Sequence, residues 1–318
     1  MMRTKRGHNK EAWALDQLTK SQLFHAKLHE WGLLEIAREI EVVRGERLSW
    51  DKDALNIAES AWNKVIHRGI KPVRVFAHPS VLIANPRRVG YYRMLAMVSQ
   101  KSMNNVGLPV TRHEVQGSPL TDDRALAIAC HLNRIISVLV DADAEIDARE
   151  FDLWRGMAAG AQAQGTSQNV KGQRAEKQVR ELIEEHLRAQ GVVAEVTEDK
   201  KGGTRVIRLT DGRRVVFASD PDTAIYTRDN TLECVAEIKG GIDTAGVLER
   251  LGATLKSLQY ASRRGKRPRT VLLMPATAMT ARFRADADAS PDLDAYFAIE
   301  SVIADPAERR RFFAALSL

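Results

Sequence analysis

The most informative segment of the chain lies at residues 232–241 and reads LECVAEIKGG. Successive side chains of a β-strand point to opposite faces of the sheet, so Glu237 and Lys239 fall on the same face, about 7 Å apart along the strand. The positions around them are mostly apolar, which puts both charges at the rim of a buried sheet. Such charges persist only where something compensates them, and a bound divalent cation would do so.

A second carboxylate precedes this strand at Asp222, within the segment 218–226, ASDPDTAIY. A hairpin would bring Asp222 against Glu237, and two carboxylates that hold a hydrated ion form a usual Mg²⁺ site. We therefore predict Asp222 and Glu237 as Mg²⁺ ligands, with Lys239 orienting or helping to activate a water molecule. Asp220 is an alternative to Asp222. We prefer Asp222 because it directly follows proline and opens an apolar run.

Helical and strand patterns alternate around this segment. Apolar runs predict strands at residues 192–197, 206–209, 214–217, 222–226, 232–239, 270–274 and 296–303. Amphipathic patterns predict helices at residues 172–190 and 244–261, and an acidic N-cap followed by proline opens a last helix at Asp305. These elements predict an α/β fold, a three-layer α/β/α core around a mixed sheet.

The first half of the chain is mainly helical by pattern. Helices are expected within residues 15–45 and at 55–66, 91–103 and 122–140, with one short strand at 72–76. Residues 158–169 are small, polar and aperiodic, either a flexible linker or an ordered crossover. We place the domain boundary there, between a mainly helical region, 1–165, and a second domain, 166–318.

Composition limits the class of protein. The 318 residues are 44% hydrophobic and 28% charged, as in a soluble globular protein. The net charge of +7 favours polyanions as partners. No stretch approaches the roughly 20 apolar residues that span a bilayer, and the basic N-terminus lacks an apolar signal core. We therefore expect a cytoplasmic protein without membrane contact, and reduced thiols at its two cysteines, Cys130 and Cys234.

The motif PD at 221–222 with EIK at 237–239 resembles the PD-(D/E)xK nuclease superfamily, over roughly residues 170–280. Within it, segments 237–246 and 249–257 resemble type II restriction endonucleases of the XcyI/XmaI group, which recognise CCCGGG and cut after the first C. The resemblance implies Mg²⁺-dependent, sequence-specific cleavage of double-stranded DNA at a short palindrome, with 5′-phosphate and 3′-hydroxyl ends.

The resemblance also implies further roles. A glutamate on the preceding helix often assists the metal site in this superfamily, and Glu176 is the matching position. Its alternative is an acidic residue that simply favours a helix N-terminus. A palindromic site favours a homodimer, in which residues 1–165 would supply DNA recognition and dimer contacts and residues 166–318 the nuclease. A cognate DNA methyltransferase is expected in the same restriction-modification system, without a stable complex.

Basic residues suggest where DNA is contacted. A cluster after the predicted helix 244–261 is either a solvated loop or, as we prefer, a phosphate-binding loop: Arg263, Arg264, Lys266, Arg267 and Arg269. Arg87 and Arg88, next to Tyr91, Tyr92 and Arg93, suggest a DNA-facing helix start. Ordinary helix packing with a snorkelling arginine is the alternative there.

Two other functions share the same motifs. A structure-specific or repair nuclease would use the same catalytic core, although the long region 1–165 argues against a minimal junction resolvase. A non-catalytic DNA-binding protein would use the acidic cluster only as structure. Cleavage assays separate both from a restriction endonuclease.

Overall fold

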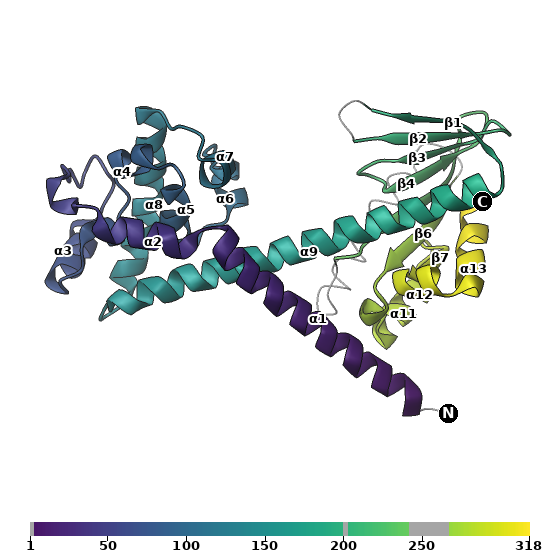
Figure 1. Cartoon of the computed structure of the whole chain (residues 1–318), viewed down its shortest axis with the longest axis horizontal. Coiled ribbons are helices and arrows are strands. Elements are labelled where there is room, and N and C mark those ends of the chain that lie inside the picture. Colours follow the sequence, from purple (N-terminus) through teal and green to yellow (C-terminus); the bar gives the residue numbers. More distant parts are fainter. Residues whose placement is uncertain (1–2, 200–202, 242–266) are drawn as a thin grey trace. The chain divides into compact units, whose positions relative to one another are not determined.

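The protein is described by a computed structural model that covers residues 3–199, 203–241 and 267–318. It divides into two compact units, Met1–Gly165 and Thr166–Leu318, whose elements are labelled in Figure 1. The predicted helix at 244–261 falls outside the described residues. Each unit has its own hydrophobic core.

A single long helix, α9 (Ala148–Ala189), runs through the division between the units. We placed the domain boundary in segment 158–169, as either a flexible linker or an ordered crossover. The segment is ordered and helical. Alanine and glutamine, which dominate this segment, are strong helix formers even where no apolar face recurs.

The first unit is helical, as predicted. Its elements are α1 (Arg3–Glu30), α2 (Leu33–Val42), η1 (Gly45–Arg47), α3 (Glu59–His67), η2 (Pro72–Arg74), α4 (Pro79–Ala84), α5 (Arg88–Leu95), α6 (Gln100–Asn105), α7 (Thr111–Gln116), α8 (Asp122–Ala142) and the start of α9. The prediction of α8 is confirmed. The helix begins after Thr121, whose hydroxyl accepts a hydrogen bond from the Arg124 amide at 3.4 Å, and it buries Ile128 and Leu132 in the core.

Within the described part of the chain, α8 has the length and composition that would allow a helix to cross a membrane. We expected no stretch of the chain to be long and apolar enough to span a bilayer, and α8 does not meet that expectation. However, 44% of its most apolar window is buried inside the protein, and its side chains form part of the first unit's hydrophobic core. Core helices of soluble proteins share these properties.

Three local predictions in this unit are wrong. The helix predicted at 55–66 begins only at Glu59, after a turn in which Asn56 has a positive φ of 56°. Residues 72–74 form the 3₁₀ helix η2 and residues 75–76 continue as a turn, not a strand; the Val75 amide donates to the Pro72 carbonyl at 2.9 Å. Val73, Val75 and Phe76 are all buried, and a fully buried turn and a buried strand have the same apolar pattern. The helix predicted over 91–103 is broken between α5 and α6 near Met97, which has a positive φ of 53°.

The second unit contains a mixed sheet of seven strands in sequential order. They are β1 (Val193–Glu198), β2 (Arg205–Leu209), β3 (Arg214–Phe217), β4 (Thr223–Tyr226), β5 (Leu232–Ile238), β6 (Arg269–Met274) and β7 (Ala295–Ala298). Neighbours from β1 to β5 pair antiparallel, whereas β5, β6 and β7 pair parallel. The predicted mixed sheet is confirmed.

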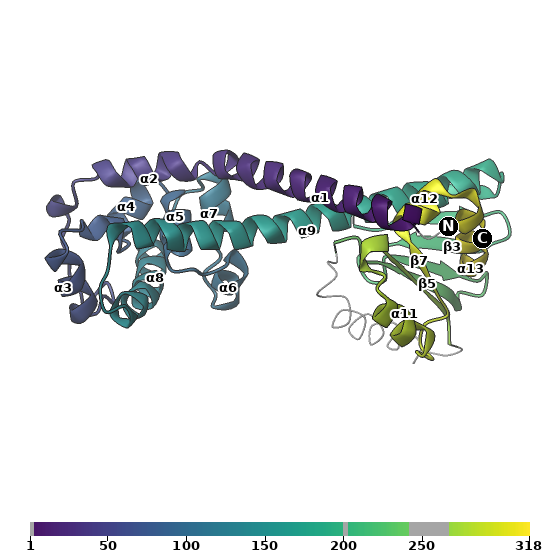
Figure 2. The same ribbon diagram turned by 90° about the horizontal axis from the view of Figure 1, so that it is seen from below.

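Helices cover both faces of this sheet. On one face, α9 packs with α12 (Ile299–Ala304) and α13 (Pro306–Leu316) around a core that contains Val179, Ile183 and Phe312. On the other face, η3 (Ala276–Ala278) and α11 (Ala281–Asp288) cover a smaller core with Phe283. Figure 2 shows α11 and α13 on different sides of the strands. The buried strands β5 and β6 lie between the two layers.

The last predicted strand is too long. Strand β7 ends at Ala298, and residues 299–304 form α12 instead, with Ile299 and Val302 buried against the sheet. The predicted start of the final helix is confirmed, because Asp305 Oδ1 accepts a hydrogen bond from the Ala307 amide at 2.8 Å. Both cysteines are free thiols, with Cys234 buried and Cys130 only partly so.

Candidate active site

The β4–β5 hairpin brings the two predicted metal ligands together. Asp222 directly precedes β4, Glu237 lies near the end of β5, and Thr223 pairs with Ala236 in the antiparallel register. Asp222 Oδ2 accepts a hydrogen bond from the Ile238 amide at 2.7 Å, which holds its carboxylate against the strand that carries Glu237.

The alternation predicted for β5 is largely confirmed. Cys234, Ala236 and Ile238 pack into the core under α9, whereas Val235 packs into the core under α11. Glu237 points to the same face as Val235 and is 6% exposed. The strand therefore places a charged residue in an apolar layer, at the end where β4 begins.

Lys239 is the cation closest to these acids among the described residues. Its Nζ forms an ion pair with Glu237 Oε1 and lies 4.0 Å from Asp222 Oδ2. One lysine thus faces two buried carboxylates, and the group retains excess negative charge.

The electrostatics of the pair show this excess. Burial, followed by repulsion from Glu237, raises the pKa of the Asp222 carboxyl from its ordinary 3.8 to about 7, although the Ile238 amide and Lys239 both act to lower it. Glu237 Oε2 is buried and has no hydrogen-bond partner among the described residues. An orphaned carboxylate oxygen beside a second acid is the arrangement that a hard cation would satisfy.

Glu176 lies close to the pair. It is on α9 and lines a narrow recess together with Asp222 and Ile238, and its charge contributes to the raised pKa of Asp222. Asp220, the alternative ligand, is exposed, whereas Asp222 is buried beside Glu237. This placement supports the choice of Asp222.

Within residues 3–199, 203–241 and 267–318, no group of three or more histidine, cysteine, aspartate or glutamate side chains is arranged to enclose a metal ion. The candidate donors that the β4–β5 hairpin brings together are the two carboxylates, Asp222 and Glu237. This set fits Mg²⁺, which keeps several of its waters and needs only one or two carboxylates.

The glycines that follow Lys239 are explained by α9. A Cβ placed on Gly240 would collide with the Ala175 Cβ, and one on Gly241 would collide with the Gln168 carbonyl oxygen. Close approach of the helix backbone therefore requires both glycines.

Little of the predicted phosphate-binding loop is described. Arg263, Arg264 and Lys266 lie outside the described residues. Arg267 forms an ion pair with Asp294 at 3.1 Å, and Arg269 donates to the Ala314 and Ala315 carbonyls at the end of α13. These two arginines thus have partners within the protein.

The predicted DNA-facing helix start is only partly accessible. Arg87 is exposed, but the Arg88 guanidinium binds Glu39 at 3.1 Å. Tyr91 and Tyr92 are buried, with their hydroxyls donating to the Arg74 and Val73 carbonyls. Helix packing, the alternative, is therefore correct for the tyrosines.

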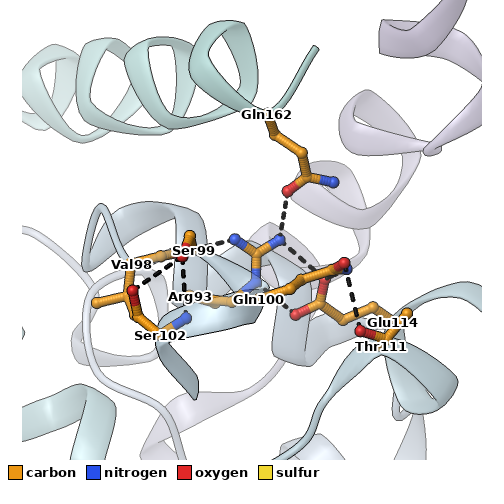
Figure 3. A network of polar contacts seen from close by, with 8 residues as sticks. All are labelled: Arg93, Val98, Ser99, Gln100, Ser102, Thr111, Glu114 and Gln162. Atoms are coloured by element: carbon orange, nitrogen blue, oxygen red, sulfur yellow. Dashed lines mark hydrogen bonds and ion pairs between the residues drawn. The ribbon is translucent and has the colours of Figure 1, made fainter. Parts of the chain in front are cut away.

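Arg93 does not snorkel to the surface, contrary to that alternative. It is 1% exposed and binds both carboxylate oxygens of Glu114, at 2.6 and 2.8 Å. Its other nitrogen contacts are the Val98 carbonyl at 2.7 Å and Gln162 Oε1 at 2.8 Å. Figure 3 shows this guanidinium joining α5, α7 and α9, so its role is structural.

One residue beside the acidic pair was not singled out by the sequence analysis. Arg180 follows Glu176 by one helical turn on α9 and lines the same recess. The available signal was this spacing, since residues four apart on a helix share a face.

Comparison with known proteins identifies the family. The family model described as XcyI restriction endonuclease matches residues 38–314. The type II restriction enzyme XcyI of Xanthomonas campestris pv. cyanopsidis is 26% identical over 258 residues, 76% of this chain and 74% of its own. The type II restriction enzyme Cfr9I of Citrobacter freundii is 28% identical over 249 residues, 73% of this chain and 72% of its own. No solved structure matches.

The site and these relatives together define the class of protein. It is a type II restriction endonuclease, a hydrolase that cuts DNA at specific sites within a restriction-modification system. Because the family model covers most of its length, the chain belongs to the XcyI restriction endonuclease family.

Proposed function

We propose that the chain is a Mg²⁺-dependent PD-(D/E)xK endonuclease that cuts double-stranded DNA at CCCGGG after the first C, and leaves 5′-phosphate ends. The observation that carries the chemistry is the buried pair Asp222 and Glu237, with one unpartnered carboxylate oxygen and Lys239 beside both acids. The recognition sequence rests on the XcyI resemblance alone.

Asp222 and Glu237 would hold the ion, with Glu176 assisting from α9. The chemistry that a bound Mg²⁺ supplies is a lowered pKa for a water and stabilisation of charge on the phosphoryl oxygens. Lys239 would donate a hydrogen bond to the attacking water and offset negative charge as it develops on the phosphoryl group. In-line attack would form the new oxygen–phosphorus bond and break the bond to the 3′ oxygen. The attacking water gives up a proton to solvent, and the leaving 3′ oxygen takes one from solvent to become a hydroxyl.

The two parts of the chain would divide the work. We propose that residues 1–165 carry DNA recognition and dimer contacts, and that residues 166–318 form the nuclease. Two copies related by a two-fold axis would each cut one strand of the palindrome. Arg87 and the loop with Arg263, Arg264 and Lys266 remain candidates for phosphate contacts. We also propose that the enzyme acts in the cytoplasm, where a cognate methyltransferase would protect the host sites.

Plasmid digestion followed by mapping of the fragment ends tests this proposal. With Mg²⁺ we expect discrete fragments that end within CCCGGG, and no cleavage in excess EDTA. An Asp222→Asn preparation, purified identically, controls for contaminating nucleases. Ca²⁺ should support specific binding with little cutting, since it accepts longer ligand distances and activates its water less.

Other results would identify a different function. Discrete cutting at another palindrome would retain the enzyme class and replace the recognition sequence. Cleavage confined to branched DNA would indicate a structure-specific nuclease. DNA binding without metal-dependent cutting would leave a non-catalytic DNA-binding protein, and undiminished cleavage in EDTA would exclude the metal mechanism.

A further inference from the structure

Arg180 has an aromatic contact but no carboxylate partner among the described residues. It belongs to α9, and its guanidinium carbon lies 5.4 Å from the centroid of the Phe217 ring. Its Nε is buried without a hydrogen-bond partner, and no ion pair joins it to another residue in the described part of the chain. Buried donors in proteins almost always have a partner, so this arginine differs from one retained for structure.

Arginines nearby on the same side of the unit are engaged. Arg205 binds Glu184 at 2.8 Å and Glu198 at 3.2 Å, and Arg188 binds Glu184 at 2.7 Å. Glu184 lies one turn beyond Arg180 on α9, yet it pairs with these two arginines and not with Arg180. The unpaired guanidinium therefore does not result from a lack of carboxylates on this surface.

Arg180 lies at the edge of the candidate active site. It lines the recess that also contains Glu176 and Asp222, and the ring of Phe217 supports its guanidinium from the neighbouring strand β3. A planar guanidinium fixed in this way loses little conformational freedom when it binds, and its donors match the geometry of phosphate oxygens.

Charge balance points to the ligand. Glu176 and Asp222 line this recess, and Asp222 in turn lies beside Glu237. A divalent cation and Lys239 would offset the charge of these acids. A DNA phosphate adds one negative charge and gains more as water attacks phosphorus. The additional positive charge that this requires is available from Arg180.

We infer that Arg180 is a substrate-binding residue of the nuclease site, which hydrogen-bonds a non-bridging phosphate oxygen of the cleaved DNA strand. This inference rests on the proposed endonuclease function. The free terminal nitrogens form the contact, while stacking on Phe217 fixes their direction. Since a phosphate is common to all DNA sequences, Arg180 contributes affinity and position but no base specificity.

The test compares Arg180→Met, Arg180→Lys and a matched control, Arg188→Met, which removes one positive charge from the same helix. Affinity for a cognate duplex is measured in Ca²⁺ across a salt series. For Arg180→Met we expect roughly 10-fold weaker binding and a salt dependence of log affinity flatter by about 0.9. Arg180→Lys should keep most of the salt dependence, and Arg188→Met should resemble the wild type.

Single-turnover cleavage in Mg²⁺ and thermal unfolding complete the comparison. Arg180→Met keeps a flexible apolar side chain on α9, so its melting temperature should stay close to that of the wild type, and it should cleave roughly 10-fold more slowly. An unchanged salt slope in Arg180→Met overturns the inference, whether cleavage is normal or slowed. A slowed rate with an unchanged slope would instead make Arg180 a positioning residue for Glu176.

The wild type in the same series separates this inference from the function on which it rests. Failure of the wild type to cut DNA with Mg²⁺ would overturn the proposed function. Normal cutting by the wild type, with identical slopes for Arg180→Met and Arg188→Met, would overturn only the assignment of Arg180.

Discussion

Alanine at position 240 tests how the active-site strand is held. A Cβ on Gly240 would lie well inside 3.0 Å of the Ala175 Cβ and 3.0 Å from the Lys171 carbonyl oxygen, whereas ordinary contact begins at 3.4 Å. Both neighbours belong to α9, and a helix backbone cannot rotate away as a side chain can. The end of β5 must therefore move from α9 by about 1 Å, because close-packed interiors have no space for an added methyl.

The magnitude follows from this displacement. Overpacking of a well-packed contact costs about 1–3 kcal/mol of unfolding free energy. Lys239 is covalently attached to Gly240 and moves with it, and a misplacement of about 1 Å at a catalytic group can slow a reaction about 100-fold. We expect Gly240→Ala to fold, to unfold at lower denaturant concentration, and to cleave cognate DNA about 100-fold more slowly.

Two further variants make the result specific. A Cβ on Gly172 would meet only the Gly241 amide nitrogen, at 3.9 Å, so Gly172→Ala should cleave normally and gain up to about 1 kcal/mol of stability as a helix residue. Adding Ala175→Gly to Gly240→Ala removes the colliding methyl and should restore much of the cleavage rate, although glycine in the helix costs about 1 kcal/mol. Single-turnover cleavage and urea unfolding measure both quantities. Wild-type cleavage by Gly240→Ala would refute this account of how Lys239 is positioned.

Further substitutions test the buried charges. Arg93→Met should lower the free energy of unfolding in urea by about 3–5 kcal/mol, because it leaves Glu114 buried and unpaired. The double variant with Glu114→Leu should recover most of that loss. Equal stability of the single and double variants would contradict this. Asp220→Asn should cleave plasmid DNA normally and Asp222→Asn should be inactive; the reverse result would make Asp220 the ligand. Lys239→Met should abolish cleavage yet bind cognate duplex in Ca²⁺ within a few-fold of wild type, and a binding loss above 100-fold would give Lys239 a main role in affinity.

Local patterns determined much of the second unit. The alternation identifies the faces of residues 234–238 in β5, because side chains of a regular strand alternate. Leu232, at the register shift opposite Tyr226, packs against the core under α11 instead. The caps at Thr121 and Asp305 locate helix starts, because each bond joins groups only two or three residues apart. The segments 237–246 and 249–257 carried the resemblance to the XcyI group, and the family model confirms that family over residues 38–314.

Local patterns predicted the wrong secondary structure where a segment is buried on all sides, because such a segment shows no alternation of apolar and polar residues. The segments 72–76 and 299–303 are apolar on every side because neighbouring elements enclose them. An apolar run of this kind is compatible with a strand, a helix or a tight turn. Which of these forms depends on what the rest of the chain packs against it, and that information is not contained in the segment.

The tertiary structure alone decided the contents of the active site. Three features depend on residues from separate elements: the carboxylate of Glu237 beside Asp222, the recess that Arg180 shares with Asp222, and the contact of Gly240 with α9. Hydrogen bonding and steric exclusion act over a few ångströms in space, whatever the distance along the chain. The motif therefore names the acids and the lysine, but only the packing of α9 against the β4–β5 hairpin determines which atoms are left without a partner and where a ligand would be held.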